Sequence, residues 1–541
     1  MRKIGFKNFR KFEDFPSINL APITFFVGEN NAGKSTVVKG LLALSDFLLG
    51  KHNFENNAYF MRDMEENDDE FAERMKAKLA DIRFYFNTSY LAHIGTFKRA
   101  LYNKAENETI VFNTNFGNYD ITINIIGNKK NDEIVWGTVS SILLKDKILQ
   151  ITMSFDLVND ISQITFNPRN ETQEIRLSSP RMSTLVNSYF GCIKKQISVS
   201  TCISNYLSAY RTDLIGSLVE ALENAINATI YPTDLTEEDN SNLRFVRGRY
   251  ACTKRIDNID EKTISFLKLI SEKCFNANPI GSDRNRFRFP FARGLRFLEF
   301  DIEYLYAHAV SQTVIYSAKD TNDYLSRTIH EFASSQRRHD KSQKEFIVEW
   351  MKEFGIGTDY NIRSVGGEAH IVTITNSDGE KVNLADKGMG SIQLMVLLFR
   401  LAITLPSKRE MRNARPHYFH NSMQGKMIII EEPEQNLHPM LQSKLADLFF
   451  KLNTEYGFNF LIETHSEYLI RRSQVIVGEK FSSQESLDSH NPFKVYYFPS
   501  DGIPYDMVYT PTGMFENKFG DGFINEAGKL HMAVLKNSQK Q

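Results

Sequence analysis

Hydrophobic and polar positions divide this chain into three stretches with different patterns. Near the N-terminus, residues 23–27 are β-branched and aromatic, which predicts a buried strand. A glycine-bounded loop follows, and we then expect a helix from Ser35 that ends at Gly50. The apolar positions that recur at helical spacing in it are Val37, Leu41, Leu44 and Leu48.

The middle of the chain changes from strand-like to helix-like patterns. Short apolar runs separated by Asn, Gly and Lys predict an antiparallel meander. The expected strands are residues 110–112, 120–126, 134–139, 148–155 and 161–166. From about 181 to 355 the pattern is mainly helical, for example over 206–230 and 259–274.

Strands and helices alternate again after this middle stretch. Residues 370–375 and 381–384 flank Asn-Ser-Asp-Gly, a hairpin turn signal. The expected elements that follow are a helix from Gly390, a strand from Met427, a helix from Pro439, a strand from Phe458 and a helix from Ser466. Such alternation is typical of α/β folds.

Three parts of the chain follow from these patterns. Residues 1–180 would hold the first part of an α/β nucleotide-binding fold with the meander. Residues 181–365 would be a mainly helical insertion that offers a dimerisation or partner surface. Residues 366–541 would complete the nucleotide-binding fold.

A phosphate-binding loop follows the first buried strand. Residues 28–35 read GENNAGKS and fit the pattern G-x-x-x-x-G-K-[S/T]. Its backbone N–H groups and the helix N-terminus favour phosphate oxygens, and the Lys34 ammonium reaches the β- and γ-phosphates of ATP. The Ser35 hydroxyl is expected to ligate Mg²⁺. The predicted ATP-binding residues are Asn30, Asn31, Ala32, Gly33, Lys34, Ser35 and Thr36.

Polar residues end two later strands. The run Met-Ile-Ile-Ile stops at Glu431 and Glu432, and α/β folds place ligands at strand ends. We expect Glu431 to serve the metal and Glu432 to act as the base that orients the attacking water. His465 follows the strand from Phe458 and is expected to contact the γ-phosphate or that water.

A glycine-rich segment opens the helix between these motifs. Lys387, Gly388, Gly390 and Ser391 stand at the expected helix start. Glycines and free N–H groups at a helix N-terminus suit phosphate contact.

The order of these motifs resembles the ABC-type ATPase heads of the SMC, RecF and OLD-like proteins. Residues 4–12 are similar to the first strand of those heads, 431–439 to an OLD-like Walker B with its D-loop, and 463–466 to a switch-histidine loop. Residues 386–393 occupy the signature position, although they read differently from L-S-G-G-Q. The resemblance implies a homodimer or higher oligomer in which ATP meets the 387–391 segment of a second head.

The tail, residues 515–523, resembles that of small bacterial ATPases of this group. The closest type is the PtuA ATPase subunit of Septu and retron-linked Septu anti-phage systems. This resemblance implies a regulatory or sensor ATPase that controls a separate nuclease effector of HNH type, with DNA or RNA, including retron msDNA, as a further partner. No D-x-D pair of a TOPRIM nuclease follows His465, so we expect no nuclease activity in this chain.

Charge and composition narrow the alternatives. Lys plus Arg is 65 and Asp plus Glu is 66, so bulk basic charge is excluded and any nucleic-acid contact must be local. The local candidates, interleaved with Phe, are Arg284, Arg286, Arg288, Arg293 and Arg296. Four cysteines without C-x-x-C spacing favour a reducing cytoplasm, and no apolar run is long enough to span a membrane.

Two other functions stay open from the sequence. One is a RecF-like DNA-repair or maintenance clamp that binds nucleic acid without an effector. The other is a degenerate ATP-binding scaffold that does not turn ATP over.

Overall fold

Two compact units make up the chain. One comprises Met1–Asn19 with Thr36–Phe300, and the other comprises Leu20–Ser35 with Asp301–Gln541. The computed structural model describes residues 3–48, 68–88, 92–128, 133–169, 180–207, 214–230, 255–272, 287, 289, 302–305, 314–317, 319, 323–335, 341–405, 427–481, 483–520, 522–524 and 526–538.

The first unit contains a nine-stranded sheet in the order β12-β11-β10-β9-β8-β7-β1-β2, with β4 paired to β9. The neighbours along this sheet run antiparallel, so the predicted meander is confirmed. Its strands are β1 (Lys3–Phe9), β2 (Phe12–Asn19), β4 (Arg83–Tyr85), β7 (Thr109–Phe116), β8 (Tyr119–Ile126), β9 (Trp136–Asp146), β10 (Ile151–Asp156), β11 (Ile161–Phe166) and β12 (Ile197–Thr201).

One strand of the meander is longer than expected. The strand predicted over 134–139 continues to Asp146, and the next begins at Ile151 rather than at 148. The Asp146 carboxylate accepts hydrogen bonds from the backbone N–H groups of Ile148 and Leu149, at 2.8 and 2.9 Å. These bonds form the turn, which apolar patterning could not distinguish from strand.

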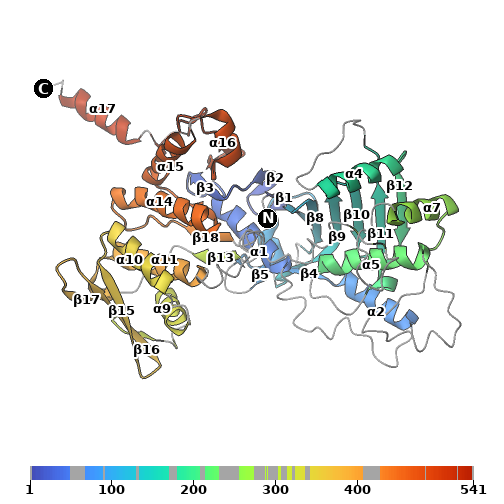
Figure 1. The fold of residues 1–541 in the computed structure, drawn as a ribbon, viewed down its shortest axis with the longest axis horizontal. Helices are drawn as coiled ribbons and strands as arrows, with labels where there is room; N and C mark the ends of the chain where they lie inside the picture. Colours follow the sequence, from blue (N-terminus) through green and yellow to red (C-terminus); the bar gives the residue numbers. More distant parts are fainter. Residues whose placement is uncertain are drawn as a thin grey trace. The chain divides into compact units, whose positions relative to one another are not determined.

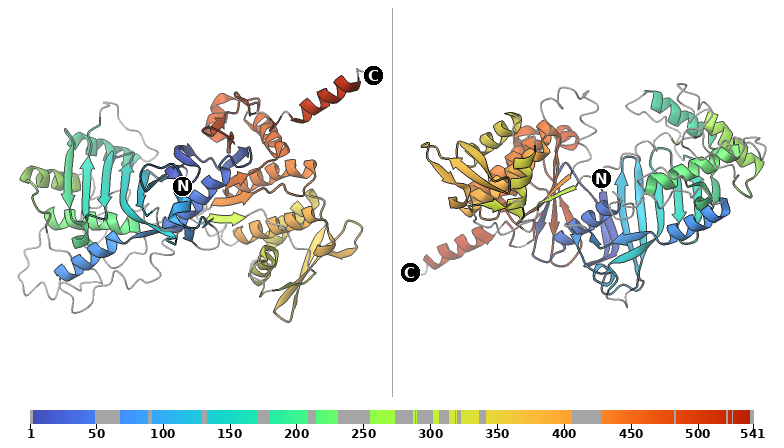
Figure 2. Two further views of the ribbon diagram at one scale, coloured as in Figure 1. Left: turned by 180° about the vertical axis from the view of Figure 1, so that it is seen from behind. Right: turned by 90° about the horizontal axis from the view of Figure 1, so that it is seen from below.

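Helices lie beside the meander sheet (Figure 2). They are α2 (Asp68–Ala80), α4 (Pro180–Cys192), α5 (Leu214–Ile230) and α7 (Glu261–Ile270). Among the described residues, the helix expected over 206–230 is α5 from Leu214 onward, and residues 203–206 form a separate 3₁₀ turn. The helix expected over 259–274 is α7, which begins after Asp260 because the Asp260 side chain accepts from the Thr263 N–H.

The second unit contains a six-stranded sheet in the order β13-β18-β19-β3-β20-β21. All neighbours are parallel except β20 and β21, so the predicted α/β fold is confirmed. The N-terminal strand β3 lies between two strands from the end of the chain. The strands are β3 (Ile23–Gly28), β13 (Ile302–Leu305), β18 (Met427–Glu431), β19 (Asn459–Glu463), β20 (Phe493–Phe498) and β21 (Tyr505–Met507).

Helices and a small antiparallel sheet complete the second unit (Figure 1). The helices are α9 (Tyr324–Ser334), α10 (Lys341–Glu353), α11 (Met389–Thr404), α14 (Pro439–Tyr456), α15 (Glu467–Lys480) and α16 (Gln484–His490). The small sheet consists of β14 (Tyr316–Ser317), β15 (Asp359–Val365), β16 (Ala369–Thr375) and β17 (Lys381–Asn383). The hairpin turn over 376–379 and the helices expected near 390, 439 and 466 are therefore confirmed.

The units differ from the three parts expected from the sequence. The part from Asp301 to 365, expected to belong to a helical insertion, belongs to the second unit. The reason is β13, which pairs in parallel with β18. A strand of four residues is too short to show an alternating pattern.

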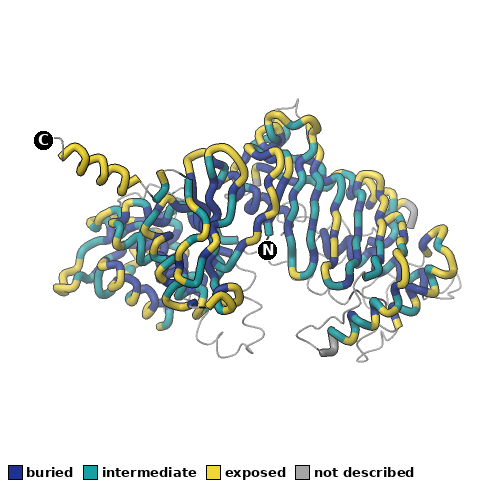
Figure 3. The backbone as a smooth tube through the Cα atoms, turned by 90° about the horizontal axis from the view of Figure 1, so that it is seen from above, coloured by how far each residue is buried: buried dark blue, intermediate teal, exposed yellow. Residues whose placement is uncertain are grey.

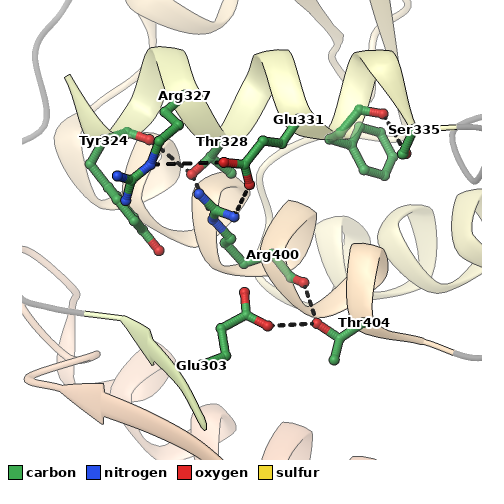
Figure 4. A network of polar contacts seen from close by, with 9 residues as sticks. Glu303, Tyr324, Arg327, Thr328, Glu331, Ser335, Arg400 and Thr404 are labelled. Atoms are coloured by element: carbon green, nitrogen blue, oxygen red, sulfur yellow. Dashed lines mark hydrogen bonds and ion pairs between the residues drawn. The ribbon is translucent and has the colours of Figure 1, made fainter. Parts of the chain in front are cut away.

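A polar network ties α11 to α9 and lies beside β13 (Figure 4). The Arg400 side chain, from α11, is ion-paired with Glu331 and donates to the Thr328 hydroxyl at 2.9 Å. Its guanidinium carbon lies 5.2 Å from the centre of the Tyr324 ring. One turn along α11, the Thr404 hydroxyl donates to the Glu303 carboxylate of β13 at 3.0 Å.

The tail packs against the edge of the second sheet. Phe519 and Phe523 contact the Tyr497 ring, at centroid distances of 5.8 and 6.3 Å. A Cβ on Gly520 would lie 2.3 Å from the Tyr497 hydroxyl, so a larger residue there would have to displace the tyrosine ring. The sequence pattern of this tail is thus explained by packing within its own unit.

The final helix, α17 (Glu526–Ser538), is exposed along its length (Figure 3). Among the described residues, none of the helices combines the length and apolar composition needed to cross a lipid bilayer.

Candidate nucleotide-binding site

Three adjacent parallel strands bring the predicted motifs to one edge of the second sheet. In the register of these strands Glu431 of β18 pairs with Glu463 of β19, and Glu463 pairs with Phe26 of β3. The phosphate loop begins two residues after Phe26, and His465 follows Glu463 by two. Motifs that are hundreds of residues apart in sequence therefore meet at the carboxyl ends of these strands.

Backbone conformation shapes the phosphate loop. Gly28 has φ 129°, and a Cβ there would lie 2.1 Å from the Phe498 carbonyl oxygen of β20. Gly33 has φ 106°, which also requires glycine, and Asn31 has φ 58°. The backbone conformation of the loop therefore favours glycine at positions 28 and 33, and the helix α1 (Lys34–Leu48) begins at the end of the loop.

The Lys34 side chain lies folded into the loop. Its ammonium group donates to the carbonyl oxygens of Gly28 and Glu29, at 3.1 and 2.9 Å. The residue is 3% exposed. Burial lowers the pKa of Lys34, while the nearby carboxylates of Glu463, Glu432 and Glu434 act in the opposite direction.

The Ser35 hydroxyl is paired with a carboxylate to which the sequence had assigned no role. It donates to both oxygens of Glu463, at 3.0 and 3.1 Å. Glu463 is 6% exposed. Burial and the adjacent Glu431 raise the pKa of Glu463 to about 7. The reasoning that singled out Glu431, a carboxylate ending a buried strand, would also have found Glu463.

The two predicted catalytic residues face each other. The His465 Nε2 atom lies 3.9 Å from the Glu432 carboxylate. Glu432 has φ 44°, its N–H donates to the Glu463 carbonyl at 2.7 Å, and its carboxylate accepts from the Gln435 amide. Burial and the Lys34 charge lower the pKa of His465, which favours the neutral imidazole.

Two further residues, which the sequence did not single out, hold the His465 loop. Glu434 accepts a hydrogen bond from the His465 N–H at 2.6 Å, and its other carboxylate oxygen is buried without a hydrogen-bond partner. Burial raises the pKa of Glu434. Gln442 of α14 accepts from the Ser466 hydroxyl at 2.6 Å. These contacts fix where the imidazole emerges from the sheet edge.

The donor chemistry of the site fits a Mg²⁺ ion that arrives with a nucleotide. Ser35, Glu431 and Glu463 supply hydroxyl and carboxylate oxygens, which this ion prefers. Within the described residues, no three His, Cys, Asp or Glu side chains are grouped so that they could hold a metal by themselves. Mg²⁺ sites built from one or two carboxylates and substrate phosphates have this composition.

The glycine-rich segment opens α11, as expected, with Gly388 at its N-cap. A Cβ on Gly390 would lie 2.5 Å from the Asn436 carbonyl oxygen, whereas one on Gly388 would meet nothing within 4 Å. The Lys387 ammonium donates to the Ile356 carbonyl at 2.9 Å and to the Asn376 side chain at 2.6 Å. Ser391 donates its N–H to the Gly388 carbonyl at 2.9 Å.

For the other predicted residues the structure gives only their burial, or does not describe them. Thr36 lies in the first turn of α1 and is 8% exposed. Asn30 is exposed and Ala32 is buried in the loop. The five basic candidates, Arg284, Arg286, Arg288, Arg293 and Arg296, lie outside the described residues.

Comparison with solved structures finds heads of SMC proteins. An SMC head bound to the C-winged helix domain of ScpA is 9% identical, with 93% of this chain and 96% of that chain covered and a TM-score of 0.32. The SMC head domain from Thermotoga maritima is 8% identical, with coverages of 94% and 98% and a TM-score of 0.29. Because these TM-scores are low, no conclusion about function is drawn from this likeness.

Comparison with curated proteins gives no match. Comparison with protein families does: residues 1–470 match the AAA ATPase domain. The matched range contains the phosphate loop, both acidic strand ends and His465. The chain therefore belongs to the AAA ATPase domain family.

Proposed function

We propose that this chain binds ATP with Mg²⁺ and hydrolyses it at the edge formed by β3, β18 and β19. The observation that carries this proposal is the meeting of Lys34 and Ser35 with Glu432 and His465 at adjacent strand ends. Phosphate oxygens would replace the two loop carbonyls as partners of the Lys34 ammonium. The loop N–H groups and the start of α1 add favourable charge for the same anion.

The catalytic roles follow from position and protonation. Glu432, about one third exposed, can accept a proton from water while His465 hydrogen-bonds to the same water or to the γ-phosphate. Glu431 faces the metal in this scheme. A neutral imidazole suits the contact of His465 with the water or the γ-phosphate, because it carries both a donor and an acceptor nitrogen.

The active form proposed here is a homodimer or a higher oligomer. Gly388, Gly390 and Ser391, at the start of α11, would contact the ATP bound to a second head, with Lys387 beside them. A helix N-terminus attracts phosphate, which supports this role. ATP binding would close the pair and hydrolysis would open it.

The biological role proposed is that of the regulatory or sensor subunit of a bacterial anti-phage defence system, of the PtuA type. The sequence resemblance supports this role, which requires a separate nuclease effector, expected to be of HNH type, in the cytoplasm. The chain itself would not cut nucleic acid. The segment with Arg284 and its neighbours is the proposed contact for DNA or RNA, including retron msDNA.

A RecF-like clamp that binds nucleic acid without an effector is the alternative. Affinity purification from the native host, with mass spectrometry and nucleic-acid extraction, separates the two. Recovery of a small HNH protein would favour the defence role. Tight binding to DNA junctions without a protein partner would favour the clamp. Purified chain that binds ATP but releases no phosphate would contradict turnover in either role.

The nucleotide site itself is tested by Lys34→Ala. We expect ATP affinity, measured by calorimetry, to fall at least about tenfold, because the variant removes a charged partner of the phosphates. The thermal unfolding temperature should change little. The matched control is Lys480→Ala, which removes an exposed lysine of α15 and should leave the affinity unchanged. Unchanged ATP affinity in Lys34→Ala would contradict the proposed site.

A further inference from the structure

The carboxylate of Glu463 lies where the phosphate loop and the acidic strand meet. β19 is the strand between β18 and β3, so its last residue has Glu431 on one side and the strand leading into the loop on the other. Glu463 is 6% exposed. A charged side chain this deeply buried is costly unless it is paired with a partner.

Both oxygens of that carboxylate are directed at one hydroxyl. The Ser35 hydroxyl lies 3.0 and 3.1 Å from them, and it is the loop hydroxyl that the nucleotide site uses toward Mg²⁺. A hydroxyl proton satisfies one lone pair of a carboxylate and leaves the others open. Those open lone pairs lie beside the Ser35 oxygen, so the two groups can face the same cation.

The balance of charge at the site also calls for a cation. Glu463, Glu432 and Glu434 act on the Lys34 ammonium group, Glu463 more strongly than the other two, and Glu431 acts on Glu463. A nucleotide would add further negative charge to this surface. A bound cation would offset the repulsion between these carboxylates and the phosphates.

Resting on the function proposed above, we propose that Glu463 is a carboxylate of the Mg²⁺ site and shares the ion with the Ser35 hydroxyl. Glu463 thereby supplies an acidic metal contact in addition to the Walker B acid Glu431. Its place in the middle of a parallel sheet holds it more rigidly than a loop residue would be held. The Ser35 contact positions it for the ion before nucleotide arrives.

Glu463→Gln tests this role through binding rather than turnover. The affinity for ATP is measured by calorimetry in Mg²⁺ and again in EDTA, and Mn²⁺ binding in the presence of nucleotide is followed by electron paramagnetic resonance. In Glu463→Gln we expect the gain in ATP affinity from Mg²⁺ to fall about ten- to a hundredfold. The affinity in EDTA should stay the same or rise, because a negative charge near the phosphates is removed.

The matched control is Glu467→Gln, in the first turn of α15, which removes the same charge four residues away. It should keep the wild-type gain from Mg²⁺. The glutamine oxygen of Glu463→Gln can still accept from Ser35, and an unchanged unfolding temperature would show that the fold survives. Glu463→Asp, which keeps the charge on a shorter side chain, should recover part of the gain.

The outcomes separate this inference from the function on which it rests. If wild-type protein does not bind ATP at all, the proposed function fails. If wild-type protein binds ATP more tightly with Mg²⁺ and Glu463→Gln shows the same gain, only the role of Glu463 is wrong. An equal loss of ATP affinity in EDTA and in Mg²⁺ would also overturn the proposed role of Glu463, since that pattern indicates a contact to nucleotide or a structural role.

Discussion

At the residue scale, the site separates two adjacent acids by backbone geometry. Glu431 ends the extended strand β18, whereas Glu432 has φ 44° and donates its N–H to the Glu463 carbonyl. The left-handed turn directs the second side chain away from the strand direction, toward His465. Neighbouring residues of the same type can thus serve different roles.

Glu432→Gln is expected to bind ATP and to hydrolyse it about 10²- to 10⁴-fold more slowly, because the amide cannot accept the proton of the attacking water. Phosphate release and ATP affinity are the two measurements. Glu431→Gln serves as the comparison, since its amide keeps the shape of the acid at the neighbouring position. Slow turnover with intact ATP binding in Glu431→Gln, and not in Glu432→Gln, would reverse the roles.

Motif spacing predicted most of the residues that meet at the sheet edge. The loop, Glu432 and His465 carry their roles in local sequence, so a single chain was enough to identify them. Glu434 was missed because its contact with the His465 N–H joins two different strand ends, and Glu463 was passed over although it ends a buried strand as Glu431 does. The Ser35–Glu463 contact joins residues 428 positions apart, and no local pattern encodes such a contact.

At the scale of elements, the start of α11 is pressed against the segment that follows Glu432. The Asn436 side chain donates to Gln393 of α11 at 3.3 Å, and Gly390 leaves no room for a Cβ against the Asn436 carbonyl. The start of α11 and the segment that follows Glu432 are therefore in direct contact.

Gly390→Ala should destabilise the protein by about 1 to 3 kcal/mol, because the added methyl overlaps backbone that has little freedom to shift. ATP turnover should fall as the segment around Asn436 is displaced. Gly388→Ala is the matched control, since that position is open and the cost should stay below about 1 kcal/mol. Denaturant unfolding and phosphate release measure the two effects, and equal behaviour of both variants would contradict this account.

The Arg400 network predicts an asymmetry between its two charged partners. The Arg400 side chain is 10% exposed and that of Glu331 is 44% exposed. Glu331→Ala leaves a buried guanidinium without its ion-pair partner, for which we expect a cost of about 2 to 3 kcal/mol. Arg400→Met leaves an acid that water can reach, and should cost less.

A double-mutant cycle checks this asymmetry by denaturant unfolding. The double variant should be about as stable as Arg400→Met alone, because once Arg400 is replaced, removal of the water-accessible Glu331 leaves no buried guanidinium without its ion-pair partner. Additive losses would show that the two side chains act independently.

Element patterns were predictable where a segment was long and periodic. The five meander strands and the helices near 390, 439 and 466 were found for this reason. β13 was missed because four residues cannot establish a period, and Tyr206, where the sequence pattern starts a helix, ends a separate 3₁₀ turn. The strand order, with β3 between β19 and β20, depends on long-range pairing that periodicity does not report.

At the scale of the whole molecule, the proposed site is complete only with a second copy of the chain. In a two-fold dimer, each site would combine the loop of one chain with the α11 start of the other. Gly388 is the right place to test this arrangement. A Cβ there would meet nothing within 4 Å in the described part of the chain, so a substitution at this position starts without a clash in its own chain.

A single Gly388→Trp head should still bind ATP, but the Gly388→Trp dimer should lose turnover. Lys34→Ala should also lose turnover, because it fails to bind ATP. Mixing the two inactive variants should restore activity. In each mixed dimer, the loop of the Gly388→Trp chain meets the intact α11 start of the Lys34→Ala chain. Half of the dimers are mixed and each has one working site of two, so phosphate release should reach about a quarter of the wild-type rate. No recovery, in a mixture shown by mass to contain mixed dimers, would mean that the site is not shared or that both sites must act together.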